Sequence, residues 1–286
     1  MTAAELNRGL RSLQVVPEPS VDRIVAGRGE TEVRGVGVVW MPSWAALREA
    51  RARGLNTIVA HEPTFYAHLD FDGFEEALAD LPPRARAAVT RTRDEKRAWI
   101  EAQAMVVIRC HDVLDLMPGG VVDSLADALG FAAADCRLAE PYHRVMAWSQ
   151  PMRADEVAQR LASRFAALGA PGVGFCGDPA REVRTLGIGT GYACDPWRFV
   201  ELGADMAVTI NDRVKTWTEL SWANDAGYPL VVIDHGTSEE WGVRALAKVI
   251  AARWPELPVQ SLPQGLSYTW VTAAGGGVER AGAPCC

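Results

Sequence analysis

The chain has 286 residues, of which 49% are apolar and 23% are charged. This balance excludes a disordered, collagen-like or coiled-coil protein, and a chain of this length can bury a core without disulfide bonds. Its formal charge of −7 argues against a nucleic-acid partner, because phosphate binding requires a basic surface. A small-molecule substrate is expected instead.

The N-terminal residues contain no apolar stretch followed by a cleavage site, and no segment approaches the ~20 apolar residues of a membrane span. The six cysteines form no CxxC pair, which favours free thiols in a reducing compartment. We therefore expect a cytoplasmic protein with no membrane partner. Cys285 and Cys286 end a Gly/Ala-rich tail, residues 273–286, which we expect to be disordered.

Short runs of Val, Ile and aromatic residues alternate with longer helical patterns, a rhythm that is typical of βα units. Strands are predicted, in chain order, at residues 34–40, 56–60, 105–110, 143–149, 184–190, 206–210 and 229–234. Apolar residues at helical spacing predict helices at residues 42–54, 121–130, 154–169, 195–203 and 237–254. The predicted fold class is therefore α/β.

Residues 131–141 break the alternation and predict a connection between two similar α/β halves, residues 1–132 and 133–272, with mixed sheets flanked by helices. Residues 67–87 contain a Pro-Pro pair and acidic residues, and they predict a helical excursion on the surface. Thr237 and Glu240 have the spacing of a capping box, which predicts that the last helix starts immediately after the strand at residues 229–234.

Three of the five histidines, His61, His111 and His235, lie at or just beyond the end of a predicted strand. This is where α/β sheets bind their ligands. Each histidine has carboxylates beside it: Glu62 next to His61, Asp112 and Asp115 after His111, and Asp234 and Glu239 around His235. Each cluster alone also fits a structural role, such as a strand end or a helix start. Three such clusters together predict a divalent-metal site.

In this order, the three segments resemble the Nif three-like family, whose members are labelled type-2 GTP cyclohydrolase-like or dinuclear metal centre proteins. The matching motifs are His61-Glu62-Pro63, the stretch from His111 to Asp115 followed by Gly119-Gly120, and Asp234-His235 followed by Glu239. The resemblance covers about residues 20–272. The chain departs from the family pattern at Glu62, where the family has a second histidine.

The resemblance implies a metal site in a cleft between the two halves. Glu62, Asp115 and Glu239 would hold one ion, and His61, His235 and Glu239 would hold the other, with Glu239 as the bridge. The carboxylate of Glu62 makes the first position all-oxygen, which favours manganese, iron(II) or magnesium over zinc. The second position can hold iron(II), manganese or zinc.

His111 and Asp112 are then not needed as ligands, and we expect them to act in proton transfer. His68 and His143 are expected to be surface or core residues outside the site. Arg109 and Arg213 are the basic residues nearest to the motifs that could contact a substrate phosphate.

Because metal pairs clamp a hydroxide and a substrate oxygen, the leading hypothesis is a metal-dependent hydrolase of a small heterocyclic or amide-like substrate, cyclohydrolase-like by resemblance. Two alternatives stay open: a non-catalytic metal-binding regulatory or interaction protein, and a mononuclear iron(II) enzyme that uses His61, His235 and Glu239. The resemblance also implies a toroidal homohexamer.

Overall fold

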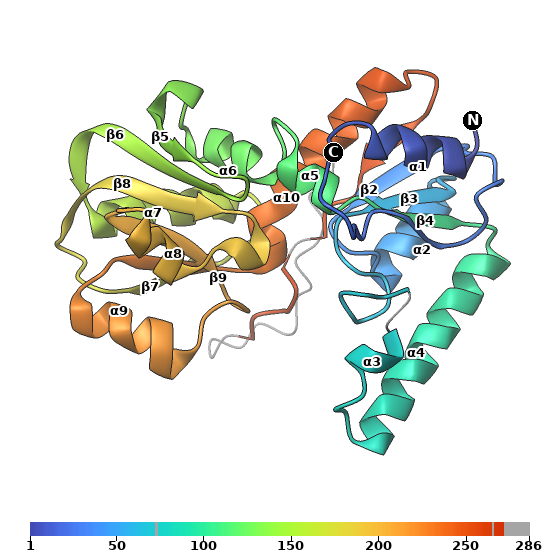
Figure 1. Ribbon diagram of the computed structural model, residues 1–286, viewed down its shortest axis with the longest axis horizontal. Coiled ribbons are helices and arrows are strands. Elements are labelled where there is room, and N and C mark those ends of the chain that lie inside the picture. The colour runs from blue at the N-terminus through green and yellow to red at the C-terminus, as the bar shows by residue number, and fades with distance from the viewer. Residues whose placement is uncertain (72–73, 265, 272–286) are drawn as a thin grey trace. The chain divides into compact units, whose positions relative to one another are not determined.

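The computed structural model describes residues 1–71, 74–264 and 266–271. The chain forms two compact units (Figure 1). The first unit comprises Met1–Met117 and Val243–Pro263, and the second comprises Pro118–Gly242 with the described residues from Gln264 on. The predicted boundary at residue 132, between two consecutive halves, differs from this division. The predicted tail at residues 273–286, with Cys285 and Cys286, lies outside the described residues.

The first unit is built on a five-stranded mixed sheet in the order β1-β4-β3-β2-β11. Strands β4, β3, β2 and β11 are parallel, and β1 is antiparallel to β4 at one edge. Their bounds are β1 Ile24–Ala26, β2 Val36–Val39, β3 Thr57–Ala60, β4 Val106–Arg109 and β11 Val259–Ser261. All residues of β2, β3 and β4 are buried, as is usual for parallel strands with helices on both faces.

The helices of the first unit are α1 Ala3–Arg11, α2 Trp44–Ala52, α3 Phe74–Ala77, α4 Pro83–Ala102, α5 Asp112–Leu116 and the part of α10 (His235–Arg253) from Val243 on. The predicted surface excursion at residues 67–87 contains α3 and the start of α4. These two helices extend away from the sheet of their unit (Figure 1). No helix in the described part of the chain is both long and apolar enough to cross a membrane.

The second unit contains a six-stranded mixed sheet in the order β5-β6-β8-β9-β10-β7. Strands β8, β9 and β10 are parallel, and the other pairings are antiparallel. Its strands are β5 Cys136–Ala139, β6 His143–Arg153, β7 Gly174–Cys176, β8 Glu182–Gly189, β9 Met206–Ile210 and β10 Leu230–Ile233.

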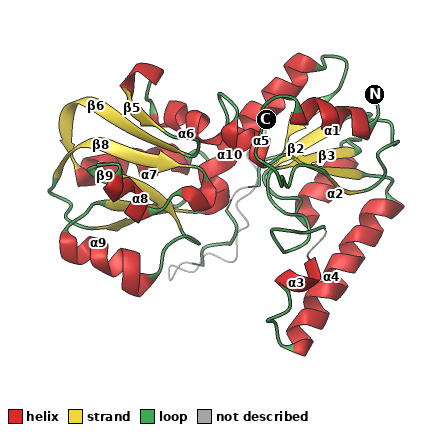
Figure 2. Cartoon of the chain, viewed as in Figure 1, coloured by secondary structure: helices red, strands yellow, loops and turns green. Residues whose placement is uncertain are grey.

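Helices flank this second sheet as well (Figure 2). The α-helices are α6 Val121–Leu129, α7 Ala154–Ala166, α8 Pro196–Glu201, α9 Ser221–Ala226 and the start of α10. Short 3₁₀ segments η1 Ala133–Asp135 and η2 Gly191–Ala193 and a π-helical segment η3 Thr216–Leu220 complete the unit. The large buried side chains Phe165 and Phe199 belong to its core.

The predicted α/β fold with two mixed sheets is confirmed, and each predicted strand and helix has a counterpart in the structure. The expected connection at residues 131–141 contains β5, a strand whose residues are only partly buried or exposed. The last helix starts immediately after the strand predicted at residues 229–234, as expected, but Thr237 does not cap it. Helix α10 begins at His235, because Asp234 Oδ1 already accepts a hydrogen bond from the backbone N of Thr237 at 3.1 Å.

Candidate metal centre

In the first unit, two neighbouring parallel strands bring the first candidate ligands to one edge of the sheet. His61 and Glu62 follow β3, and His111 follows β4 after Cys110. Ala60 is paired with Arg109, so the residues that follow them leave the sheet at the same level. The carboxyl ends of parallel strands are the usual ligand-binding edge of an α/β sheet.

Asp22 fixes the turn after β4. Its side chain accepts hydrogen bonds from the backbone N of His111, of Asp112 at 3.1 Å and of Val113 at 2.8 Å. The Asp22 carboxylate therefore satisfies the free N–H groups at the start of α5. The backbone N of Asp115 bonds to the carbonyl of His111 at 3.0 Å, which places Asp115 one helical turn after His111.

These elements gather His61, Glu62, His111 and Asp115. Asp115 Oδ1 lies 3.8 Å from His61 Nε2, and Asp115 Oδ2 lies 3.4 Å from His111 Nδ1. The two imidazole rings stack with centroids 4.5 Å apart and planes 7° apart. One donor atom from each of His61, His111 and Asp115 lies within 4.8 Å of the other two. These side chains are therefore candidate metal-binding groups.

The electrostatics of this cluster favour positive charge. Burial disfavours the charged imidazole of His111, but Asp112 and Glu62 outweigh it and hold the pKa of His111 well above its usual value. Asp112 Oδ1 lies 3.3 Å from His111 Nδ1. Burial opposes ionisation of Asp112 too, yet hydrogen bonds from His111 and Ser20 keep the pKa of this carboxyl below its usual range. The cluster holds more carboxylates than basic groups, and a divalent cation would balance their negative charge.

Arg109 was a candidate contact for a substrate phosphate, but in the structure its side chain is buried and binds neighbouring protein groups. Its side chain is 1% exposed and lies 3.7 Å from a carboxylate oxygen of Glu62 and 3.7 Å from one of Asp70. Its Nε donates to the carbonyl of His61 at 3.3 Å, and its Nη1 donates to the carbonyl of His68. The guanidinium thus ties together the loop that carries His61 and Glu62.

His68 is an exposed residue, as expected, but it lies beside the candidate site. Its ring packs edge-on against His111, with centroids 5.6 Å apart, because the loop after Glu62 folds back over the end of β4. Burial, followed by the charge of Arg109, lowers the pKa of His68. His143, by contrast, contacts the carbonyl of Ala193 at 2.7 Å through Nε2, in the second unit.

The second unit gathers His235 and Glu239 at the ends of its three parallel strands. His235 Nε2 lies 3.4 Å from Glu239 Oε2, one helical turn along α10. The other ring nitrogen, Nδ1, lies 3.0 Å from Asp212 Oδ2, and Asn211 Oδ1 accepts from the backbone N of His235 at 3.2 Å. A carboxylate on the far side of an imidazole is the usual way to orient a metal-ligating histidine.

Because Gly191 has no side chain, the space next to His235 Nε2 and the Glu239 carboxylate stays open. It follows β8, has a φ of +36°, and a Cβ on it would lie 2.5 Å from both Glu239 Oε1 and His235 Nε2. Only a residue without a side chain fits at such a contact. The donor types, the orientation of His235 by Asp212 and the clearance at Gly191 all fit a divalent ion.

Asp22, Asp212 and Gly191 are not among the site residues predicted from the sequence. Asp212 and Gly191 each lie within two residues of the end of a predicted strand, so the same strand-end argument that selected the histidines could have found them. Asp22 had no such signal, because it precedes the residues that it holds by about 90 positions.

A family model described as Duf34/NIF3 (NGG1p interacting factor 3) matches residues 84–263. A search of curated proteins gave no significant match. Similar solved structures include the hypothetical protein SA1388 of Staphylococcus aureus, with 17% identity, a TM-score of 0.71, and 95% of this chain and 99% of that chain covered. A Bacillus cereus protein related to NIF3 is 14% identical, with a TM-score of 0.70 and the same coverage.

Reduced HcgD from Methanocaldococcus jannaschii is 14% identical, with a TM-score of 0.63 and coverage of 92% of this chain and 98% of that chain. At these identities, the likeness to solved structures shows a shared fold.

Proposed function

We propose that this chain, which belongs to the Duf34/NIF3 family, is a metal-dependent hydrolase with a dinuclear centre that acts on a small heterocyclic or amide-like substrate. The observation that carries the proposal is that donor atoms of His61 and Asp115 come together, with a ring nitrogen of His111 beside them, all within 4.8 Å of one another. The paired donors His235 and Glu239 in the second unit support it.

Glu62, Asp115 and Glu239 are the proposed ligands of one ion, and His61, His235 and Glu239 are those of the other. When bound, a pair of divalent ions lowers the pKa of a water molecule and polarises a substrate oxygen. The all-oxygen set favours manganese or iron(II), and the set with two imidazoles also accommodates zinc.

His111 and Asp112 are proposed to move the proton. Asp112 is itself held in place, since its Oδ2 accepts a hydrogen bond from the backbone N of Val21 at 3.0 Å. Its Oδ1 faces His111 Nδ1, and Nε2 of the same ring lies 3.6 Å from Glu62 Oε1, so the imidazole can pass a proton between the carboxylates on its two sides. This arrangement supports a role of the His111 ring in proton transfer.

The position of the Tyr192 ring supports the proposal that the substrate is planar. It directly follows Gly191, its side chain is exposed, and its ring lies over the guanidinium of Arg213, whose carbon is 5.1 Å from the ring centroid. Arg213 is held in turn by Asp195, with 2.6 Å between nitrogen and oxygen. A fixed aromatic face beside candidate ligands is suited to stacking on a heterocycle.

We expect the purified protein to carry about one to two equivalents of divalent transition metal per chain. Elemental analysis measures this content, and a panel of cyclic amides and nucleobase-like heterocycles tests hydrolysis before and after chelation. Metal-dependent turnover supports the hydrolase. Bound metal without turnover of any panel member supports the regulatory alternative, and oxygen consumption supports the mononuclear iron(II) enzyme. A chain that takes up no metal even after reconstitution contradicts all three.

The homohexamer implied by the family resemblance is likewise a proposal. Light scattering is expected to give the mass of six copies of the 31.0 kDa chain. A monomer at micromolar concentration would rule this assembly out.

A further inference from the structure

A small pocket opens at the amino ends of the parallel strands in the first unit. It lies between the segment that precedes β2, the end of α2 with the segment that follows it, and the end of α4. Its volume is about 210 Å³, and the residues that line it are Arg34, Arg51, Gly54, Leu55, Asn56 and Gln103. We call it the Arg34 pocket. A drug-sized ligand needs at least roughly 300 Å³, so this pocket suits a small ion or chemical group.

The Arg34 pocket lies at the end of the sheet opposite to the candidate metal ligands of its unit. Asn56 directly precedes β3, whereas His61 directly follows it, and the four residues of this strand span about 13 Å. Gln103 likewise stands before β4, and His111 stands after it. A small ligand in the Arg34 pocket would therefore not touch these histidines. An inference about this pocket goes beyond the proposed function.

The side chains of the pocket that are free to bind a ligand are hydrogen-bond donors. Asn56 is buried, its Oδ1 accepts from the backbone N of Arg34 at 2.8 Å, and its Nδ2 donates to the carbonyl of Glu32 at 2.8 Å. Gln103 Oε1 accepts from Arg51 Nε at 3.1 Å. The guanidinium of Arg34, the two Nη groups of Arg51 and the Nε2 group of Gln103 remain, and all of them only donate.

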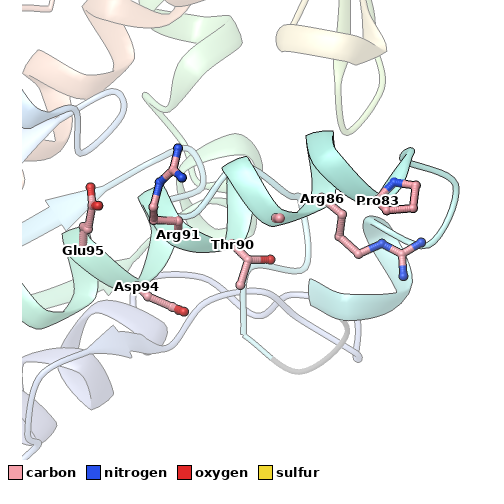
Figure 3. A pocket seen from close by; sticks show the side chains of 7 residues that line it. Pro83, Arg86, Thr90, Arg91, Asp94 and Glu95 are labelled. Carbon is pink, nitrogen blue, oxygen red and sulfur yellow. The ribbon is translucent and has the colours of Figure 1, made fainter.

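The two arginines of the pocket have no carboxylate partner within the parts of the chain that the structure describes. Arg51 is bonded to an uncharged amide, and Arg34 forms no ion pair there. None of the described residues that line the pocket is acidic. A larger hollow of about 630 Å³ along α4 differs, because arginines share its lining with Asp94 and Glu95 (Figure 3). The Arg34 pocket thus concentrates positive charge on a chain with a formal charge of −7.

The arginines are not needed to close the helices that end at the pocket. In α2, the carbonyl of Ala50 accepts a hydrogen bond from the backbone N of Leu55 at 2.9 Å, and a bond of the same kind ends α4. Such bonds satisfy the terminal carbonyls of a helix. Arg51 in the last turn of α2 does suit the helix dipole. Arg34 belongs to no helix, so the dipole does not account for its position.

We propose that the Arg34 pocket binds a phosphate group, either as free phosphate or as the end of a small phosphomonoester. The oxygens of a phosphate group accept hydrogen bonds, and the planar guanidinium donates pairs of N–H bonds that match them. Arg34 and Arg51 would each bind phosphate oxygens, and Gln103 Nε2 would add a neutral donor. A carboxylate has two oxygens and a single charge, so it would use fewer of these donors.

Titration calorimetry with inorganic phosphate at constant ionic strength tests the proposal on the full-length protein as purified. Arg34→Gln and Arg51→Gln are each expected to bind phosphate at least about tenfold more weakly than wild type, because each loses charge-assisted hydrogen bonds. Arg48→Gln is the matched control, since it removes the same charge from α2 outside the pocket. It should bind phosphate as wild type does. Both lining arginines are exposed, so the variants should fold, and circular dichroism checks this.

A second titration, with phenyl phosphate, distinguishes the two sources of the phosphate group. Tighter binding than that of inorganic phosphate assigns the pocket to a phosphomonoester, and weaker binding assigns it to the free ion. Phenylglyoxal, which modifies accessible arginines, locates the site independently when the modified peptides are identified by mass spectrometry. Phosphate is expected to protect Arg34 and Arg51 from this reagent and to leave Arg48 unprotected.

The variants also separate this pocket from the candidate metal centre, where phosphate could bind to metal ions. Phosphate bound only at metal ions would leave Arg34→Gln and Arg51→Gln with the affinity of wild type. That result, or a wild type that binds no phosphate at millimolar concentration, would overturn the proposal. The test does not depend on metal content or turnover, so failure of the proposed hydrolase function would leave it unaffected.

Discussion

Replacing Gly191 with alanine is expected to prevent metal binding at His235 and Glu239 and to abolish most of the proposed hydrolase activity. A Cβ at this position would lie 2.5 Å from His235 Nε2 and 2.5 Å from Glu239 Oε1, which are the atoms that would bind the ion. The ring of His235 cannot turn away without losing the 3.0 Å contact between its Nδ1 and Asp212. Displacing both donors is expected to lower metal affinity at least about 100-fold.

Gly203→Ala is the control for this prediction. Gly203 also has a positive φ, +74°, but a Cβ there would meet nothing within 4 Å. Both variants therefore carry the backbone strain of a non-glycine residue at positive φ, which is about 1–2 kcal/mol. Elemental analysis and turnover after identical purification compare them. If Gly191→Ala kept the metal content of wild type, the space next to His235 and Glu239 would not be the metal-binding site.

The sequence predicted the strands that carry the candidate site because these strands are buried on both faces. β2, β3 and β4 are continuous apolar runs whose residues are all buried, so hydrophobicity alone identifies them. The strands β5, β7 and β11 were missed because their residues are partly buried or exposed. Short edge strands of this kind take their conformation from the neighbour with which they pair.

The candidate site, too, could be predicted only where local sequence patterns mark its residues. His61, His111 and His235 could be found because each follows a predicted strand and carries chemistry of its own. Asp22 and His68 could not, since a loop brings each of them to residues that are distant in sequence: Asp22 to the start of α5 and His68 to the ring of His111. Local patterns therefore predict the candidate ligands, whereas the residues that hold them in place depend on tertiary contacts.

Glu62→His is expected to raise the retention of zinc, because it restores an imidazole where the family pattern has one. Carboxylate oxygen is a hard ligand, and imidazole suits zinc better. With Glu62, Asp115 and Glu239 as ligands, the first position should release zinc readily. One nitrogen donor in place of Glu62 is expected to raise the fraction of zinc that survives mild chelation by about tenfold. Glu239→Ala, in contrast, should weaken both positions because a bridging ligand is lost.

The substitution also changes the partners of Arg109. Burial lowers the pKa of this guanidinium, and Asp70 and Glu62 are the two carboxylates that most oppose the loss of its charge. Glu62→His leaves Asp70, 3.7 Å away, so we expect a loss of stability of about 1–3 kcal/mol, less than when a buried pair is broken completely. Glu62→Gln makes the same change of charge without adding an imidazole. It should therefore share the loss of stability but not the gain in zinc.

Metal content after the same chelator treatment, measured for wild type and for the three variants, separates these effects. If Glu62 served only as a partner of Arg109, Glu62→His and Glu62→Gln would show equal losses of stability and the zinc retention of wild type. That result would remove Glu62 from the ligand set, and it would leave the candidate site of the first unit to His61, His111 and Asp115, whose donor atoms already lie within 4.8 Å of one another.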